Sequence, residues 1–128
     1  MKKIIFTLLF STLVFSSPSY ADWTKVGTNM RGDTFYVDFD RIRKHDGYVY
    51  FWWLSDYLKP TKYGHLSTKL YNQGDCKLFR VKALSDFSYT NSMGNGTPSA
   101  SNNKEDIEWR YPSPNSALET ILNSVCSH

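Results

Sequence analysis

Two cysteines, Cys76 and Cys126, are the residues whose types and spacing point most directly to a chemical event. The start of the chain has the pattern of an export signal, and exported thiols meet an oxidising compartment in which paired cysteines persist as disulfides. Two cysteines allow one intramolecular pairing. The alternative, an unpaired metal-binding or redox pair, lacks a C-x-x-C spacing and a nearby histidine cluster. We therefore predict a Cys76–Cys126 disulfide, which closes a loop of about 50 residues.

The other ionisable residues form no pattern that is typical of catalysis. The three histidines, His45, His65 and His128, share no spacing that would build a metal site, and we interpret them as surface residues. The carboxylates fall in no spacing that identifies a general acid and base pair. The sequence contains no nucleophile elbow, Walker loop or dinucleotide fingerprint. We expect a protein that is not an enzyme and that binds no metal or cofactor.

Basic and aromatic residues are the remaining candidates for a binding function. Arg41, Arg43 and Lys44 form a small basic cluster that would suit an acidic glycan or a protein partner, although a solvated turn is the preferred interpretation. The chain has 9 Tyr, 8 Phe and 4 Trp. These residue types fill cores, and they also dominate the centres of binding interfaces.

The longest expected strand, residues 48–57, is apolar on both faces. Side chains alternate along a strand, so one face carries Tyr48, Tyr50, Trp52 and Leu54, and the other carries Val49, Phe51 and Trp53. A sheet with one solvated face would alternate apolar and polar side chains. We therefore expect this strand in the middle of a sheet that is covered on both sides over part of its length.

A C-terminal helix can cover only one face of such a sheet. The other face is predicted to meet a second subunit or an external partner through some of a set of side chains, or through their opposite-parity neighbours. The set is Val49, Phe51, Trp53, Phe79 and Val81. One deep aromatic core, closed by loops such as residues 91–103, is the open alternative.

The elements that would position these residues follow from periodicity and turn signals. Expected strands span residues 23–26, 34–38, 48–57, 65–72, 76–83 with an extension over 84–93, and 107–111. A helical turn is expected over 39–44, a turn over 73–75 and a mobile loop over 91–103. A helix capped by Ser113, with Pro114 in its first position, carries one apolar stripe. The stripe is Ala117, Leu118, Ile121, Leu122 and Val125. The predicted fold is α+β, an antiparallel sheet of about six strands with this helix on one face, tethered by the disulfide.

The first 21 residues have the charge, apolar core and small-residue cleavage order of a secretory signal peptide, with cleavage after Ala21. The apolar run of about a dozen residues is shorter than the roughly 18 that a retained membrane anchor needs. The residue directly after the cleavage point is Asp22 and not a cysteine, so lipid anchoring at that position is not expected. Residues 22–128 suit one domain. Without Lys2 and Lys3 the basic count falls from 15 to 13 against 12 acidic residues, so the charge falls from +3 to +1, which argues against nucleic-acid binding.

The order of short motifs over residues 22–128 resembles the bacterial surface-adhesin protein E family. The matching residues are Trp23-x-x-Val26, Tyr36-Val37-Asp38, Trp53 to Tyr57 with Pro60, Ser67-x-Lys69, Asp75-Cys76, Met93-Gly94, Trp109, Pro112-Ser113 and Val125-Cys126. The resemblance implies a six-stranded antiparallel sheet whose C-terminal helix is tethered to the concave side, and it implies homodimerisation. It further implies binding of host matrix and serum proteins such as laminin and vitronectin. Family namesakes are outer-membrane lipoproteins, and this chain departs from them at the signal.

Three functional hypotheses follow. The first is a secreted or envelope-associated binding protein, adhesin-like, whose partner is a host matrix protein or a bacterial envelope component. The alternative is a periplasmic structural or accessory protein with bacterial partners. The third, a small hydrolase or lytic enzyme, would need a convergent carboxylate or nucleophile cluster in a cleft. The first two predict an exported protein without a transmembrane segment after signal cleavage.

Overall fold

The computed structural model describes residues 21–128, so the predicted signal peptide, residues 1–21, lies outside the described residues except for Ala21. The described chain forms a sheet and one α-helix, with two short 3₁₀ turns. The strands are β1 (Thr24–Thr28), β2 (Thr34–Val37), β3 (Arg43–His45), β4 (Tyr48–Asp56), β5 (Ser67–Asp75), β6 (Arg80–Tyr89) and β7 (Ala100–Asn102). The helical elements are η1 (Phe39–Arg41), η2 (Ser92–Gly94) and α2 (Ala117–Cys126).

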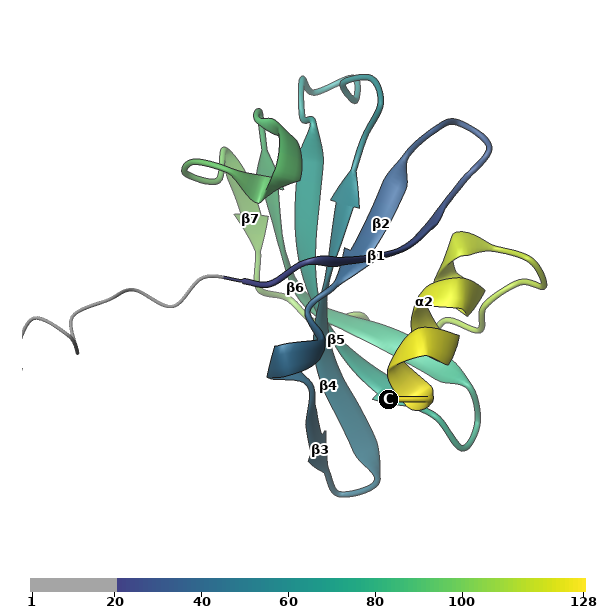
Figure 1. The fold of residues 1–128 in the computed structure, drawn as a ribbon. Helices are drawn as coiled ribbons and strands as arrows, with labels where there is room; N and C mark the ends of the chain where they lie inside the picture. The colour runs from purple at the N-terminus through teal and green to yellow at the C-terminus, as the bar shows by residue number, and fades with distance from the viewer. Residues whose placement is uncertain (1–20) are drawn as a thin grey trace, which may run out of the picture.

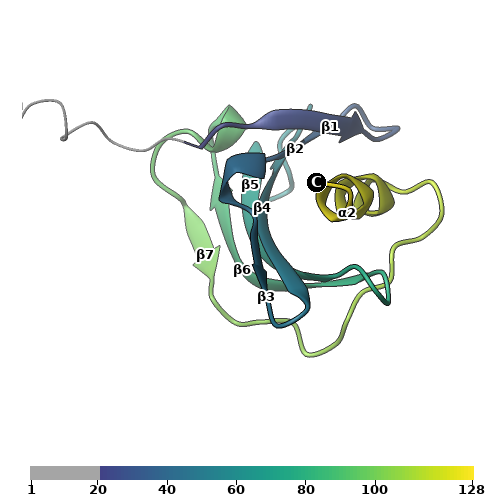
Figure 2. The ribbon, with the colours of Figure 1, turned by 60° about the horizontal axis from the view of Figure 1, so that its bottom comes forward.

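The strands form one antiparallel sheet in the order β1-β2-β4-β5-β6-β7, and the short β3 pairs with the first residues of β4. The order follows the sequence almost strand by strand because short turns join most neighbours. The sheet curves, and α2 lies inside the curve (Figures 1 and 2). The sheet thus has a concave face against α2 and a convex face on the other side.

The core lies between α2 and the concave face. The helix carries Ile121, Leu122 and Val125 on one side, each at most 1% exposed. These side chains pack in one cluster with Phe51 of β4 and Val81 of β6. Full burial of side chains of this size stabilises a fold by about 1.5–3 kcal/mol each. The apolar stripe on the helix therefore holds it on the sheet, as the sequence predicts.

The predicted disulfide is present. Cys76 and Cys126 are bonded, with 5.7 Å between their Cα atoms. Cys126 directly follows the buried Val125, so the bond attaches the end of α2 to the turn between β5 and β6. The predicted architecture, an antiparallel sheet with a tethered C-terminal helix, is confirmed.

The turn between β5 and β6 lies three residues later than predicted. The sequence indicates a turn over 73–75, but β5 continues to Asp75 and residues 76–79 form the turn. The Asp75 carboxylate accepts hydrogen bonds from the backbone N–H groups of Lys77 and Leu78, at 3.1 and 3.2 Å. Phe79 closes the turn in the left-handed region, with φ of 52°. The hydrogen bonds to the Asp75 side chain thus place the turn after Asp75, although Gly74 is the residue that favours a turn over 73–75 in the sequence.

Two other segments also differ from their predictions. The predicted strand 107–111 is reduced to one bridge between Val81 and Arg110. The predicted loop 91–103 contains η2 and the short strand β7, which pairs with β6. In residues 21–128, no helix combines the length and apolar character needed to cross a membrane.

The helix begins later than its sequence signal. The structure caps α2 at Ser116, whose hydroxyl oxygen accepts a hydrogen bond from the Glu119 N–H at 3.1 Å. Ser113 and Pro114 belong to the preceding turn, which Asn115 closes with φ of 62°. Both Ser113 and Ser116 are good caps, and the turn decides between them.

Candidate functional site: the convex face of the sheet

The side chains named for a binding face lie on the covered side of the sheet. Phe51 and Val81 are fully buried, and Val49 and Trp53 are 4% and 7% exposed. Phe79 packs against the same cluster, under α2. This corrects the expectation that this set faces a partner. The physical reason is that Cys76 lies in a turn, where the alternation of a strand no longer fixes which face the disulfide reaches.

Their opposite-parity neighbours lie on the other face of the sheet, where Leu54 is fully buried and the aromatic side chains are half-buried. We call the set Tyr48, Tyr50, Trp52, Tyr71 and Phe87 the convex surface. Each of these side chains is half-buried, and none packs against α2. The Trp52 ring lies 5.0 Å from Tyr71 and 6.0 Å from Phe87, centroid to centroid. Tyr50 stacks on Tyr71 at 6.4 Å. Strands β4, β5 and β6 thus contribute to one continuous patch of rings.

Two arginines lie over these rings. The Arg41 guanidinium is 5.8 Å from the Trp52 centroid, and that of Arg43 is 5.9 Å from the Tyr50 centroid. These distances are within the range of cation–π attraction. Arg41 is held by the buried carboxylate of Asp38, which accepts its Nε–H at 2.7 Å. The basic side chains are therefore pre-positioned on the aromatic surface.

Arg43 makes a second contact with the rings. It donates to the Tyr71 hydroxyl at 3.1 Å, and this hydrogen bond raises the pKa of Arg43 above its ordinary value. The third predicted cation, Lys44, points elsewhere, because it pairs with Val49 and its Nζ lies 3.5 Å from the carbonyl oxygen of His128. The predicted basic cluster therefore places two of its three members on the convex surface.

A shallow depression lies between the arginines and the rings. It has a volume of about 410 Å³, and its lining includes Asp40, Arg41, Arg43, Trp52 and Tyr71. Polar donors, one carboxylate and aromatic faces thus meet at one point. Such a mixture is typical of a protein-binding surface with a central aromatic anchor.

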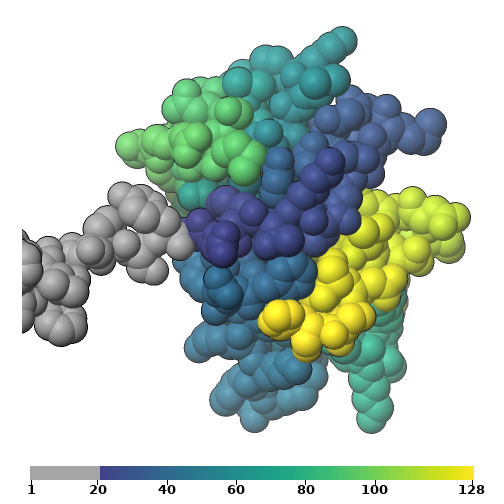
Figure 3. All heavy atoms as spheres, viewed as in Figure 1, coloured from purple at the N-terminus to yellow at the C-terminus, as the bar shows by residue number. Residues whose placement is uncertain are grey.

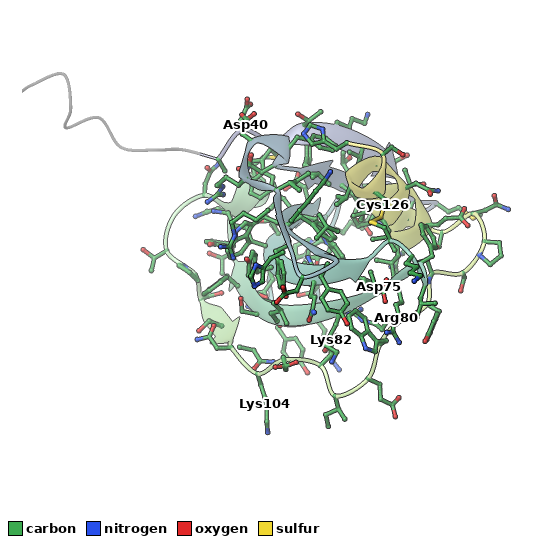
Figure 4. The ribbon with its side chains drawn as sticks, turned by 90° about the horizontal axis from the view of Figure 1, so that it is seen from below. Asp40, Asp75, Arg80, Lys82, Lys104 and Cys126 are labelled. Carbon is green, nitrogen blue, oxygen red and sulfur yellow. A yellow bond between two sulfur atoms is a disulfide. The ribbon has the colours of Figure 1, made fainter. Side chains whose placement is uncertain are left out.

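A second group of cations and rings extends the face toward its lower end. Trp109 stacks on Tyr48 at 5.8 Å, and Arg80 and Lys82 lie over its ring at 4.3 and 4.8 Å. Arg80 also donates to the Asp75 carboxylate at 2.9 Å, and Figure 4 shows these two side chains close to Lys82. Burial alone would raise the pKa of Asp75, but hydrogen bonds from Leu78 and Arg80 lower it.

The sequence motifs did not identify this second group. Arg80 and Lys82 lie two residues apart on β6 and therefore share the face opposite to Val81. The shared face of Arg80 and Lys82 could therefore be predicted from the sequence. The position of Trp109 could not, because Trp109 lies outside any regular strand, next to the single bridge between Arg110 and Val81.

The histidines do not converge. His45 contacts Asp46 at 3.1 Å, His65 lies 6.3 Å from the Tyr63 ring, and His128 lies 5.0 Å from the Phe39 ring. Among residues 21–128, no three His, Cys, Asp or Glu side chains gather in a way that would hold a metal ion.

Comparison with known proteins gives one family and one fold. The sequence model of the surface-adhesin protein E family matches residues 23–127. Crystal form II of Haemophilus influenzae protein E has a similar structure, with a TM-score of 0.60, 16% identity, and coverage of 86% of this chain and 91% of that chain. The selenomethionine form of the same protein has a TM-score of 0.60 and 15% identity, with coverage of 87% of this chain and 90% of that chain. None of the curated proteins matches this chain.

Proposed function

Because the chain belongs to the surface-adhesin protein E family, we propose that it is an exported, non-catalytic binding protein that acts through the convex surface. Its partner is a protein with an exposed acidic region. A host matrix or serum protein fits this description, as the family resemblance implies for laminin and vitronectin. A component of the bacterial envelope is the other source of such a partner.

The observation that carries this proposal is the contrast between the two faces of the sheet. α2 covers the concave face, whereas Tyr50, Trp52 and Tyr71 stay half-exposed on the convex face. Trp, Tyr and Arg are the residue types most enriched among the side chains that dominate binding energy. Here Arg41 and Arg43 lie directly over such rings.

The charges favour an acidic partner. The side chain of Arg41 is 48% exposed although its Nε is paired with Asp38, so about half of it remains accessible to a partner. Arginine offers five donors in a planar fork that matches a carboxylate in two-bond geometry. A carboxylate of the partner that docks beside Trp52 would complete this arrangement.

The test is a binding assay of the purified protein against immobilised laminin, vitronectin and envelope extract. Trp52→Ala should weaken binding to the positive partner by roughly 30-fold or more, the loss expected for an interface centre. Ile107→Ala is the control, because Ile107 is an apolar residue that is 95% exposed and belongs to neither the convex surface nor a loop between strands β1 and β2 or β4 and β5. Wild-type affinity in Trp52→Ala, or an equal loss in Ile107→Ala, would contradict the proposal.

The place of action needs its own test. External protease on intact cells should degrade a surface-exposed binding protein, whereas a periplasmic accessory protein stays intact until the outer membrane is breached. Full protection in intact cells would favour the envelope partner over the host partner.

A further inference from the structure

Two loops lie together at one end of the sheet. The β1–β2 loop spans residues 29–33 and the β4–β5 loop spans residues 57–66. Figure 1 shows both at the upper end of the molecule, and the space-filling view in Figure 3 shows them projecting there. We call these two loops the loop end. It is separate from the convex surface, because none of the residues defined for that surface belongs to either loop.

A buried carboxylate joins the two loops. Asp33, 8% exposed, accepts the Asn29 side-chain amide at 3.0 Å and, across the gap, the backbone N–H of Leu58 at 3.0 Å. Within the β4–β5 loop, Thr61 and His65 are hydrogen-bonded to each other through the backbone at 2.9 Å. The loop end is therefore a structured unit with a fixed shape.

Large apolar side chains project from this unit into solvent. Met30 is 105% exposed, Leu58 is 65% exposed and Tyr63 is 73% exposed. Apolar residues scattered singly on a surface need no explanation. Three of them in two adjoining loops do, with Met30 and Tyr63 in turns and Leu58 two residues after β4, because turns and loops normally carry polar residues at such positions.

The same loops carry cations and no free carboxylate. Arg31, Lys59 and Lys62 are exposed, and the one acidic residue in the two loops, Asp33, is buried and hydrogen-bonded. A cavity of about 590 Å³ opens between the loops, and its lining includes Arg31, Lys59, Thr61 and Asp33. Asp33 pairs with Arg31 at 3.6 Å, so the net positive charge of the two loops comes mainly from Lys59 and Lys62.

We propose that the loop end docks on an anionic phospholipid bilayer. Leu58 and Met30 insert at the level of the headgroups, Tyr63 lies at the polar boundary, and the cations pair with lipid phosphates. Binding at such an interface grows with the apolar area inserted and with the attraction of cations to anionic lipid. An acidic protein surface would pair with the cations but leave the side chains of Met30, Leu58 and Tyr63 in water. An anionic bilayer binds both the cations and these three apolar side chains.

Vesicle flotation with the purified protein tests this proposal. The protein should float with vesicles containing phosphatidylglycerol and not with pure phosphatidylcholine vesicles, and binding should weaken as salt is raised. The double substitution Lys59→Gln with Lys62→Gln should lower affinity about 25-fold, at about fivefold for each cation. Met30→Ser with Leu58→Ser should lower it roughly tenfold or more.

Ile107→Ser is the matched control, because Ile107 is 95% exposed and lies outside both loops. It should bind vesicles as the wild type does. Circular dichroism melts of all variants should coincide with the wild type, since the altered side chains are exposed. No flotation of the wild type with anionic vesicles, or equal losses in Ile107→Ser and the loop variants, would overturn the proposal.

Discussion

Replacing both cysteines with serine tests the covalent attachment of α2 to the sheet. The bond between Cys76 and Cys126 spans 50 residues of sequence. In the chain-entropy model, a loop of that length removes about 14 cal/mol/K from the unfolded state, which is about 4 kcal/mol at room temperature. That figure is a large share of the roughly 5–15 kcal/mol of net stability in a small domain.

Changes in side-chain packing add little to this loss of unfolding free energy. Cys76 is exposed and Cys126 is half-buried, so the serine hydroxyls remain near water. Val125 beside Cys126 is 1% exposed, and its burial should keep the end of α2 on the sheet when the bond is absent. We therefore expect a variant that still folds, with its helix in place, but is less stable by about 4 kcal/mol.

Urea unfolding, followed by tryptophan fluorescence, measures the difference. The midpoint should fall, and the urea dependence of the unfolding free energy should rise, because an unfolded chain without a cross-link exposes more surface. Reduced and alkylated wild type is the control and should match the double variant. A difference below about 1 kcal/mol would refute the entropic reasoning, since the loop length alone requires more.

Three further changes probe the core, the sheet and the helix cap. Gly74→Ala should lower the unfolding free energy by about 1–3 kcal/mol, because the added Cβ would lie 2.9 Å from Val49 Cγ1; an unchanged urea midpoint would argue against this close packing. Burial and the nearby carboxylate of Asp106 raise the pKa of Asp86, so the fold disfavours its charged form. Asp86→Asn should therefore raise the melting temperature at neutral pH, with no gain at pH values below the ordinary aspartate range, where the carboxyl is neutral in both states; a gain that persists in acid would point to another cause. Ser116→Ala should cost about 1 kcal/mol in urea unfolding, because the cap hydroxyl accepts a helix N–H, and a loss below a few tenths would move the cap elsewhere.

The sequence was sufficient for the architecture because several independent signals agreed. The apolar stripe on α2, the double apolar face of β4 and the single cysteine pair each restrict the fold, and together they require a helix clamped on a sheet. The positions of the turns were harder to predict from the sequence. At Asp75 a side-chain carboxylate caps the turn, and such a local hydrogen bond leaves no periodic trace in the sequence.

The binding face shows a different limit. Alternation sorts β4 into two sets of side chains, but both sets are apolar, so the pattern alone does not say which set α2 covers. The disulfide would decide this if Cys76 lay within a strand, and it lies in a turn. The arginines were found from the sequence as a charge cluster, whereas the position of Arg41 over Trp52 depends on η1 and that of Arg43 over Tyr50 depends on the pairing of β3 with β4.

The spacing of the two cysteines also sets an order of events during biogenesis. A polypeptide that crosses a translocase from its N-terminus delivers Cys76 while Cys126 is still 50 residues behind. The strands can assemble in that interval, but Phe51 and Val81 have no lid until the last helix emerges. The bond between Cys76 and Cys126 can therefore close only after the last helix has emerged, and the core residues on the concave face stay uncovered until then.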